Sequence, residues 1–359
     1  MRLLLCIALA LPAALAQAHK PSDSYLTLEA QGAALRGQWD IALRDLEHAL
    51  GLDGDGDGAI TWGELRAKHQ EIAAYAFARL ALSGCKVEPG ALLADRHSDG
   101  GYAVLQFAVD CGSVLPKDIE LRYSLFADLD PTHRGLVRAR IGERTTTGVL
   151  GPERPTLLIG ADGGSGFLDY LREGVWHIWI GFDHVLFLVS LLLPAVLAVA
   201  RFAPAFWDVF KVVTAFTVAH SITLALAALG VVNLPSRLVE SAIALSVVLA
   251  ALNNLWPVVH RGRWLVAFAF GLVHGFGFAT VLAELGLPQA SLVGALLGFN
   301  LGVEMGQLAI VALFLPLAYA ARHTWMYRRM LFVGGSAAIA LIAAIWMVER
   351  AFDLQLGLI

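Results

Sequence analysis

The 359-residue sequence has little charge and almost no cysteine. Charged residues make up 16% of it, against about 25% in soluble domains, and 57% of it is hydrophobic, so we expect a membrane protein. The formal net charge of −4 gives no basic surface, which excludes nucleic acid as a partner. The three cysteines, Cys6, Cys85 and Cys111, are too few for a thiolate metal site. Any bound metal must therefore use nitrogen and oxygen ligands.

Residues 1–18 have the three parts of a secretory signal peptide. Arg2 gives a positive start, a short apolar run follows, and Ala16-Gln17-Ala18 is typical of a cleavage site. The apolar run is shorter than the ~20 residues of a membrane span, which disfavours a membrane anchor. We therefore expect the next domain to be exported. In an oxidising compartment, Cys85 and Cys111 are then expected to form a disulfide.

Residues 19–165 are predicted to form a periplasmic β-rich domain. Apolar and polar residues alternate in residues 25–29, 102–107 and 119–123, which is typical of half-buried strands. Residues 41–82 are expected to be an insertion of two helices around a loop, with the second helix running from Leu65 to Leu82. The polar segment 128–134 is expected to be a surface turn, with a docking patch as the alternative.

The loop at residues 53–64 matches the twelve-residue calcium-binding pattern of an EF-hand. Acidic residues stand at alternate positions, Gly58 permits a sharp turn, and Glu64 is placed to close the ligand shell from the next helix. The alternative is a solvated turn rich in Asp and Gly. The expected calcium ligands are Asp53, Asp55, Asp57, Ala59, Thr61 and Glu64.

Six apolar segments follow a Gly-rich linker, each close to the ~20 residues that cross a membrane. They are residues 175–200, 209–230, 237–258, 264–284, 291–318 and 331–348. Lys and Arg concentrate in the loops after the first, third and fifth segments, so the positive-inside rule gives the same orientation as the signal peptide. We therefore predict an all-α six-helix transmembrane bundle at residues 166–359, in a bacterial inner membrane, after the periplasmic domain.

Ionisable and polar residues inside these segments are costly and mark candidate functional positions. Counting 1.5 Å per residue from the outer end of each helix places most of them about 12–15 Å deep, with Glu304 about 20 Å deep. Imidazoles and carboxylates at one depth suit a divalent transition metal, although each histidine alone could simply bond a neighbouring helix. The predicted metal-handling residues are His177, Asp183, His184, His220, His274 and Glu304, with Asn300 in the same layer.

His177 and His184 lie on one face of the first membrane helix, seven residues apart. A continuous helix separates them by about 10.5 Å along its axis, which is too far for one ion. His177 is therefore expected to be an outer station, together with Glu240 on the third helix. A break in the helix at Gly181 would change this expectation.

The His177-x5-Asp183-His184 signature resembles that of the HupE/UreJ family, and Val273-His274-Gly275 looks like a second His-Gly motif of the family. The similarity covers residues 170–350, and the exported domain resembles the longer branch. Members are regarded as nickel permeases linked to the maturation of hydrogenase and urease. The resemblance implies a nickel permease, with metalloenzyme maturation proteins as partners and metal-handling roles for His177, Asp183, His184 and His274.

A divalent-metal permease is the first of three functional hypotheses. The sequence contains no Walker motif, so ATP is not expected to drive transport directly. The second hypothesis is an intramembrane metal-dependent hydrolase with Asp183 or Glu304 as general base, although no His-Glu-x-x-His motif occurs. The third makes the exported calcium-binding domain an accessory module on a membrane anchor. An anchor, however, needs only one helix and no buried charges.

Overall fold

The computed structural model describes residues 22–31, 34–97, 100–112, 114–142, 144–160, 166–197, 199–259, 261–277, 289–352 and 354. The predicted signal peptide lies outside these residues. The described chain divides into a β-rich unit, residues 22–168 together with 289–294, and a helical unit, residues 169–277 together with 295–354. Each unit is described by itself.

The β-rich unit contains two sheets, and all paired strands are antiparallel except β1 and β7. The first sheet has the order β4-β5-β2-β1-β7-β8, with strands β1 (Asp23–Gln31), β2 (Ala34–Ala42), β4 (Lys86–His97), β5 (Gly100–Asp110), β7 (Arg134–Ile141) and β8 (Arg144–Leu150). The second has the order β3-β6-β9, with strands β3 (Leu80–Leu82), β6 (Ile119–Tyr123) and β9 (Thr156–Ile159). Strands β1, β5 and β6 contain the three stretches predicted from alternation.

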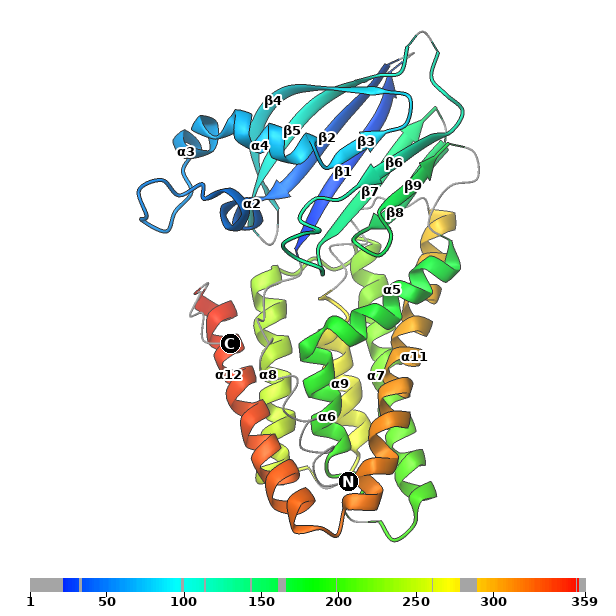
Figure 1. Ribbon diagram of the computed structural model, residues 1–359. Helices are drawn as coiled ribbons and strands as arrows, with labels where there is room; N and C mark the ends of the chain where they lie inside the picture. The colour runs from blue at the N-terminus through cyan, green and yellow to red at the C-terminus, as the bar shows by residue number, and fades with distance from the viewer. Residues whose placement is uncertain are drawn as a thin grey trace. The chain divides into compact units, whose positions relative to one another are not determined.

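A helix and the second sheet lie against one face of the larger sheet (Figure 1). Aromatic side chains are prominent in the buried core of this unit. Trp39 of β2 is fully buried, with its ring centroid 5.6 Å from that of Tyr123 in β6. Phe77 contacts both Trp39 and Phe107, at centroid distances of 6.3 Å and 5.3 Å. Phe77 is the last residue of α4 (His69–Phe77), so this helix and the second sheet cover one face of the first.

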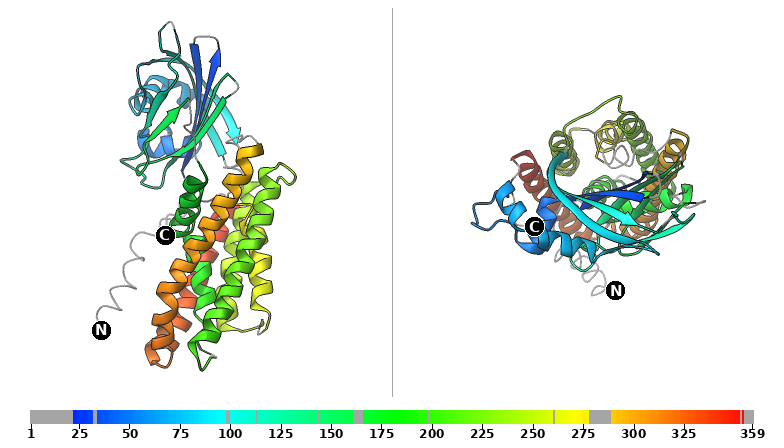
Figure 2. Two further views of the ribbon diagram at one scale, coloured as in Figure 1. Left: turned by 90° about the vertical axis from the view of Figure 1, so that its right-hand side faces the viewer. Right: turned by 90° about the horizontal axis from the view of Figure 1, so that it is seen from above.

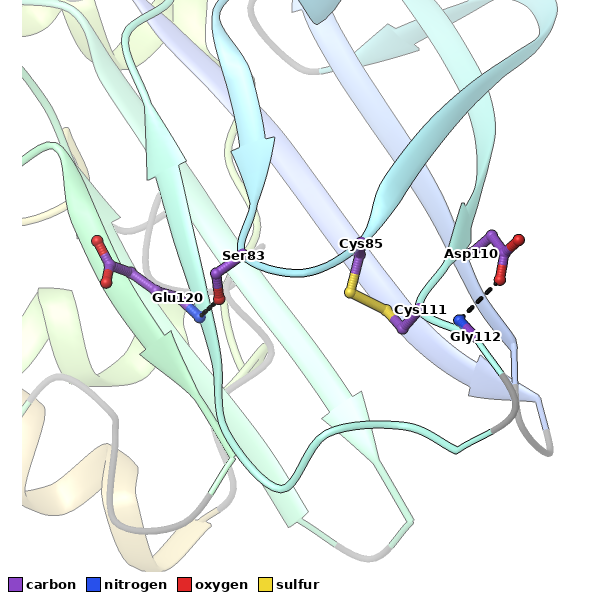
Figure 3. The surroundings of a disulfide bond; sticks show 6 residues. All are labelled: Ser83, Cys85, Asp110, Cys111, Gly112 and Glu120. Carbon is purple, nitrogen blue, oxygen red and sulfur yellow. Dashed lines mark hydrogen bonds between the residues drawn. A yellow bond between two sulfur atoms is a disulfide. The ribbon is translucent and has the colours of Figure 1, made fainter.

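The predicted disulfide joins Cys85 to Cys111 (Figure 3). The two cysteines lie next to Lys86 and Asp110, which pair with each other in the β4–β5 ladder. The bond therefore continues the ladder covalently. Because it closes a loop of 26 residues, it stabilises the folded state by roughly 3 kcal/mol in the chain-entropy model.

The helical insertion consists of α2 (Leu43–Leu50), α3 (Trp62–Ala67) and α4. The second predicted helix is interrupted at Lys68, where φ is −90° and ψ is 5°. The prediction that this helix reaches Leu82 is wrong, because residues 80–82 form strand β3 against β6. Tertiary pairing overrides local helical propensity there.

The polar segment 128–134 forms a turn, as expected, but its histidine is not on the surface. His133 is 1% exposed and contacts the side chains of Ser22 and Tyr123. Burial lowers the pKa of His133 to about 3, so its ring is neutral at neutral pH. This imidazole is part of the core and does not serve as a docking residue.

The helical unit contains long helices that run side by side (Figure 2). They are α5 (Phe167–Ile180), α6 (Phe182–Leu192), α7 (Phe202–Ala228), α8 (Ser236–Leu255), α9 (Arg263–His274), α11 (Gln289–Ala321), the π-helical segment η2 (Met326–Gly334) and α12 (Gly335–Phe352). Helix α12 packs along α8, and α9 packs along α7.

Four helical segments are long and apolar enough to cross a membrane: Phe202–Ala228, Ser236–Leu255, Leu292–Ala321 and Met326–Phe352. The pair α5 and α6, bent by 70°, would make a fifth span if it counts as one. The predicted fourth segment, residues 264–284, contains the 12-residue helix α9 and then continues beyond the described residues. The described chain therefore gives four or five candidate spans where the sequence predicted six.

Candidate metal site

A break in the first membrane segment brings two histidines together. Helix α5 ends at Ile180 and α6 begins at Phe182, because Gly181 leaves the helical conformation with ψ at 90°. The ring centroids of His177 and His184 are 4.7 Å apart. The expectation that these residues are too far apart to share an ion is therefore wrong for this helix, and the physical reason is the bend at Gly181.

His220 of α7 completes a group of three imidazoles. Its ring centroid is 6.4 Å from that of His177. One candidate ligand nitrogen from each of His177, His184 and His220 lies within 4.8 Å of the other two. Two nitrogens that bind one ion at about 2.1 Å each are at most about 4.2 Å apart, so small side-chain movements suffice for shared coordination. These three residues are called the imidazole cluster below.

Several ring nitrogens at the site are buried without a hydrogen bond among the described residues. They are Nε2 of His184, Nε2 of His220 and Nδ1 of His274. The ring of His274, on α9, lies 5.0 Å from that of His184. An unsatisfied buried polar atom costs about 1–3 kcal/mol, and a metal ion bound to these lone pairs would remove that cost. The donor chemistry of the site therefore fits a metal.

Phenyl rings surround the imidazoles and provide an apolar wall. Phe299 lies 5.3 Å from His177, Phe187 lies 5.1 Å from His274, and Phe216 lies 5.2 Å from His274, measured between ring centroids. An apolar surrounding keeps water away from the ring nitrogens.

The two predicted carboxylates are engaged elsewhere. Asp183 accepts two hydrogen bonds from Arg350 of α12, at 2.8 Å and 3.3 Å, and the same guanidinium lies 3.5 Å from the carbonyl oxygen of Glu240. Glu304 accepts a hydrogen bond of 2.8 Å from Thr214. Within the described part of the chain, neither carboxylate belongs to a metal-sized group with the histidines. The prediction that they are direct ligands thus finds no geometric support.

Glycines allow the helices that carry the site to approach closely. A Cβ atom at Gly275 would lie 2.3 Å from the carbonyl oxygen of His220, which places α9 against α7. A Cβ atom at Gly302 would lie 2.0 Å from the carbonyl oxygen of Leu171, which places α11 against α5. Both distances are shorter than any side chain tolerates, so these positions require glycine, and small residues of this kind let membrane helices pack closely.

The acidic loop of the β-rich unit brings three carboxylates together. Oxygens of Asp53, Asp55 and Asp57 lie within 4.8 Å of one another. Backbone N–H groups of Gly56 and Gly58 donate to Asp53, and Gly58 has a φ of +83°, as the sharp turn requires. Three of the six expected calcium ligands therefore lie close together.

Glu64 makes local bonds at the end of the loop. It accepts hydrogen bonds of 2.8 Å from the backbone N–H groups of Gly54 and Thr61. These bonds, those from Thr61 first, lower the pKa of Glu64, so it is charged at neutral pH. Thr61 caps α3, and Ala59 lies between the aspartates and this cap. Glu64 does not belong to the group of three aspartates whose oxygens lie within 4.8 Å of one another.

Sequence reasoning did not identify Ser246 and Arg350. The hydroxyl oxygen of Ser246 in α8 lies 2.8 Å from Nε2 of His274. Arg350 pairs with Asp183, which stands 167 residues earlier in the sequence. The available signal for Ser246 was a polar residue inside an apolar helix. Arg350 follows the last predicted apolar segment. Its pairing with Asp183 could not be predicted, because a contact between residues so far apart in the sequence depends on how the helices pack.

The comparisons with known proteins identify the family of the chain. A search among curated proteins gives no match. The family described as HupE / UreJ protein matches residues 153–350, which include every histidine of the site and cover more than half of the chain. The chain therefore belongs to the HupE/UreJ family.

Proposed function

We propose that the protein is a membrane permease for a divalent transition-metal ion, with nickel favoured, and that the ion binds at the imidazole cluster. The observation that carries this proposal is the set of three histidines on three helices with ligand nitrogens within 4.8 Å. The HupE/UreJ family is generally one of transporters, which supports the same function.

The donors of the cluster define the class of ion. Neutral imidazoles suit nickel, cobalt, copper and zinc, whereas calcium and magnesium prefer oxygen ligands. The Asp183–Arg350 pair adds no net charge beside the cluster, so an ion is held by nitrogen donors and not by excess negative charge. Transport requires binding that is strong enough to remove water from the ion and weak enough to release it. A gradient or an intracellular metal sink supplies the driving force.

The hydrolase hypothesis receives less support from the same geometry. A metal hydrolase needs a general base beside the metal-bound water. Both carboxylates proposed for that role already have partners. Asp183 forms an ion pair with Arg350, and Glu304 accepts a hydrogen bond from Thr214. The permease hypothesis needs no such base and is the one we retain.

Replacing His184 with alanine tests the proposed function. His184 lies next to His177 and His274, so we expect uptake of labelled nickel into vesicles to fall by at least about 10-fold, as for the loss of a metal-site residue. Cobalt, zinc and copper, assayed in parallel, identify the preferred ion. The matched control is His323→Ala, because His323 is exposed. Uptake that is equal in His184→Ala and wild type would contradict the proposal.

We also propose that the acidic loop binds calcium through Asp53, Asp55, Asp57, Ala59, Thr61 and Glu64. The convergence of the three aspartates supports this site. Because calcium affinity depends on the number of charged ligands, we expect Asp55→Ala to weaken calcium binding by about 10-fold or more in titrations of the purified full chain. The control is Asp95→Ala, which removes an exposed carboxylate from β4. Wild-type protein that binds no calcium would show that the loop is only a solvated turn.

A further inference from the structure

We infer that Asn300 and Ser246 are positioning residues that fix the tautomers of His220 and His274, so that each imidazole presents an unprotonated nitrogen to the transported ion. The inference rests on the proposed function and extends it to two residues that do not touch the ion. It follows from the directions of four hydrogen bonds.

The orientation of Asn300 determines the proton position on His220. The Nδ2 atom of Asn300 lies 2.8 Å from the carbonyl oxygen of Leu296, which can only accept a hydrogen bond. The amide nitrogen must therefore face Leu296, so the amide oxygen faces His220, 3.1 Å from its Nδ1. Because an amide oxygen also only accepts, Nδ1 of His220 must carry the proton.

The hydroxyl of Ser246 determines the proton position on His274 in the same way. Its oxygen lies 2.6 Å from the carbonyl oxygen of Ile243, and this contact requires the hydroxyl proton. Towards Nε2 of His274, at 2.8 Å, the hydroxyl can then only accept. Nε2 of His274 must therefore carry the proton.

The two nitrogens left without a proton are the ones that lack a partner. In a neutral imidazole only one ring nitrogen is protonated, so the lone pairs are on Nε2 of His220 and Nδ1 of His274. Both atoms are buried without a hydrogen bond among the described residues. Only an unprotonated nitrogen can bind a metal, and the partner of the other nitrogen decides which one that is.

The same bonds also favour the class of ion proposed above. Metal-binding histidines commonly donate their second N–H to an outer oxygen, which fixes the ring and raises the basicity of the ligand nitrogen. Asn300 on α11 and Ser246 on α8 supply such oxygens. With lone pairs fixed before the ion arrives, the site suits ions that bind nitrogen well. It does not provide the oxygen ligands that magnesium and calcium prefer.

The alternative is that the bonds only hold helices together. A purely structural role predicts that tautomers and metal affinity respond to any loss of packing and not to the chemistry of the acceptor. The two roles are separated by paired variants. Asn300→Leu and Ser246→Ala remove the acceptor, whereas Asn300→Gln and Ser246→Thr retain an acceptor oxygen.

The experiment combines nitrogen NMR with metal titration. Metal-free protein with 15N-labelled histidine, reconstituted in lipid, is examined by solid-state NMR, with signals assigned through His220→Gln and His274→Gln. We expect Nδ1–H for His220 and Nε2–H for His274 in wild type, and mixed tautomers in Asn300→Leu and Ser246→Ala. Nickel affinity should fall about 10–100-fold in these two variants, as when a metal-binding histidine loses the partner of its second nitrogen. Asn300→Gln and Ser246→Thr should stay within a few-fold of wild type.

The opposite tautomers in wild type would overturn the inference, and so would unchanged nickel affinity in Asn300→Leu and Ser246→Ala. The wild-type spectrum decides the point even if a variant does not fold. Failure of the proposed function gives a different result, because a wild-type protein that takes up no metal still reports its tautomers in the metal-free spectrum.

Discussion

Replacing Gly181 with leucine should lower the nickel affinity of the purified protein by more than about 100-fold, which exceeds the usual effect of losing a residue that only bonds to a metal ligand. A Cβ atom at Gly181 would lie 2.7 Å from the carbonyl oxygen of His177 and 2.9 Å from Nδ1 of His184. A leucine side chain therefore fits at this position only if the backbone bend or the ring of His184 moves. If α5 and α6 join into one helix, His177 and His184 move to about 10.5 Å apart and cannot share an ion.

Isothermal titration with nickel in detergent measures this effect. The matched control is Gly335→Ala in α12, where a Cβ atom would meet nothing closer than 4.0 Å. Alanine is the better helix former, so this variant should bind nickel like wild type. Gly181→Leu with wild-type affinity would mean that the bend is not needed to bring the two histidines to one ion.

Replacing Arg350 with methionine should lower the stability of the helical unit by about 3–5 kcal/mol, the usual cost of leaving one member of a buried ion pair alone. The side chains of Asp183 and Arg350 are only 18% and 14% exposed. Methionine has an apolar side chain of similar length, so the main change is the loss of the cation. The carboxylate of Asp183 is then buried without a compensating charge.

A double-mutant cycle measured by thermal unfolding checks this prediction. Adding Asp183→Asn to Arg350→Met removes the uncompensated charge and should restore most of the lost stability. The control cycle uses Asp208 and Arg263, whose pair is more open, with Asp208 50% exposed, and should show a coupling below about 1 kcal/mol. Additive effects of Asp183→Asn and Arg350→Met would show that the pair does not stabilise the fold.

The sequence predicted elements well where a periodic pattern decides them. Alternation located strands β1, β5 and β6. Apolar length located the ends of α8 and α11 to within a few residues, whereas α5 and α7 begin well before the predicted first and second segments. The constant rise of an α-helix also predicted that His184, His220, His274 and Asn300 share a layer. In the structure, His184 contacts His274 directly, His220 and His274 both contact the ring of Phe216, and His220 is hydrogen-bonded to Asn300.

The sequence could not predict features that depend on contacts between distant residues. The bend at Gly181 was recognised only as an alternative, because glycine permits a break without requiring one. The pairing of Asp183 with Arg350 could not be predicted, because Arg350 is in the last helix, far from Asp183 in the sequence. The bonds of Asn300 and Ser246 were missed for the same reason. In the β-rich unit, the pairing of residues 80–82 with β6 overrode a helical pattern.

The central claim is that the break at Gly181 places His177 and His184 on the same ion, with His220 as a third ligand. X-ray absorption spectroscopy of nickel bound to the purified protein counts the imidazole ligands directly. We predict at least three histidine nitrogens in wild type and one fewer in His177→Ala. A spectrum dominated by oxygen ligands, or an unchanged imidazole count in His177→Ala, would contradict the account and leave His177 outside the site.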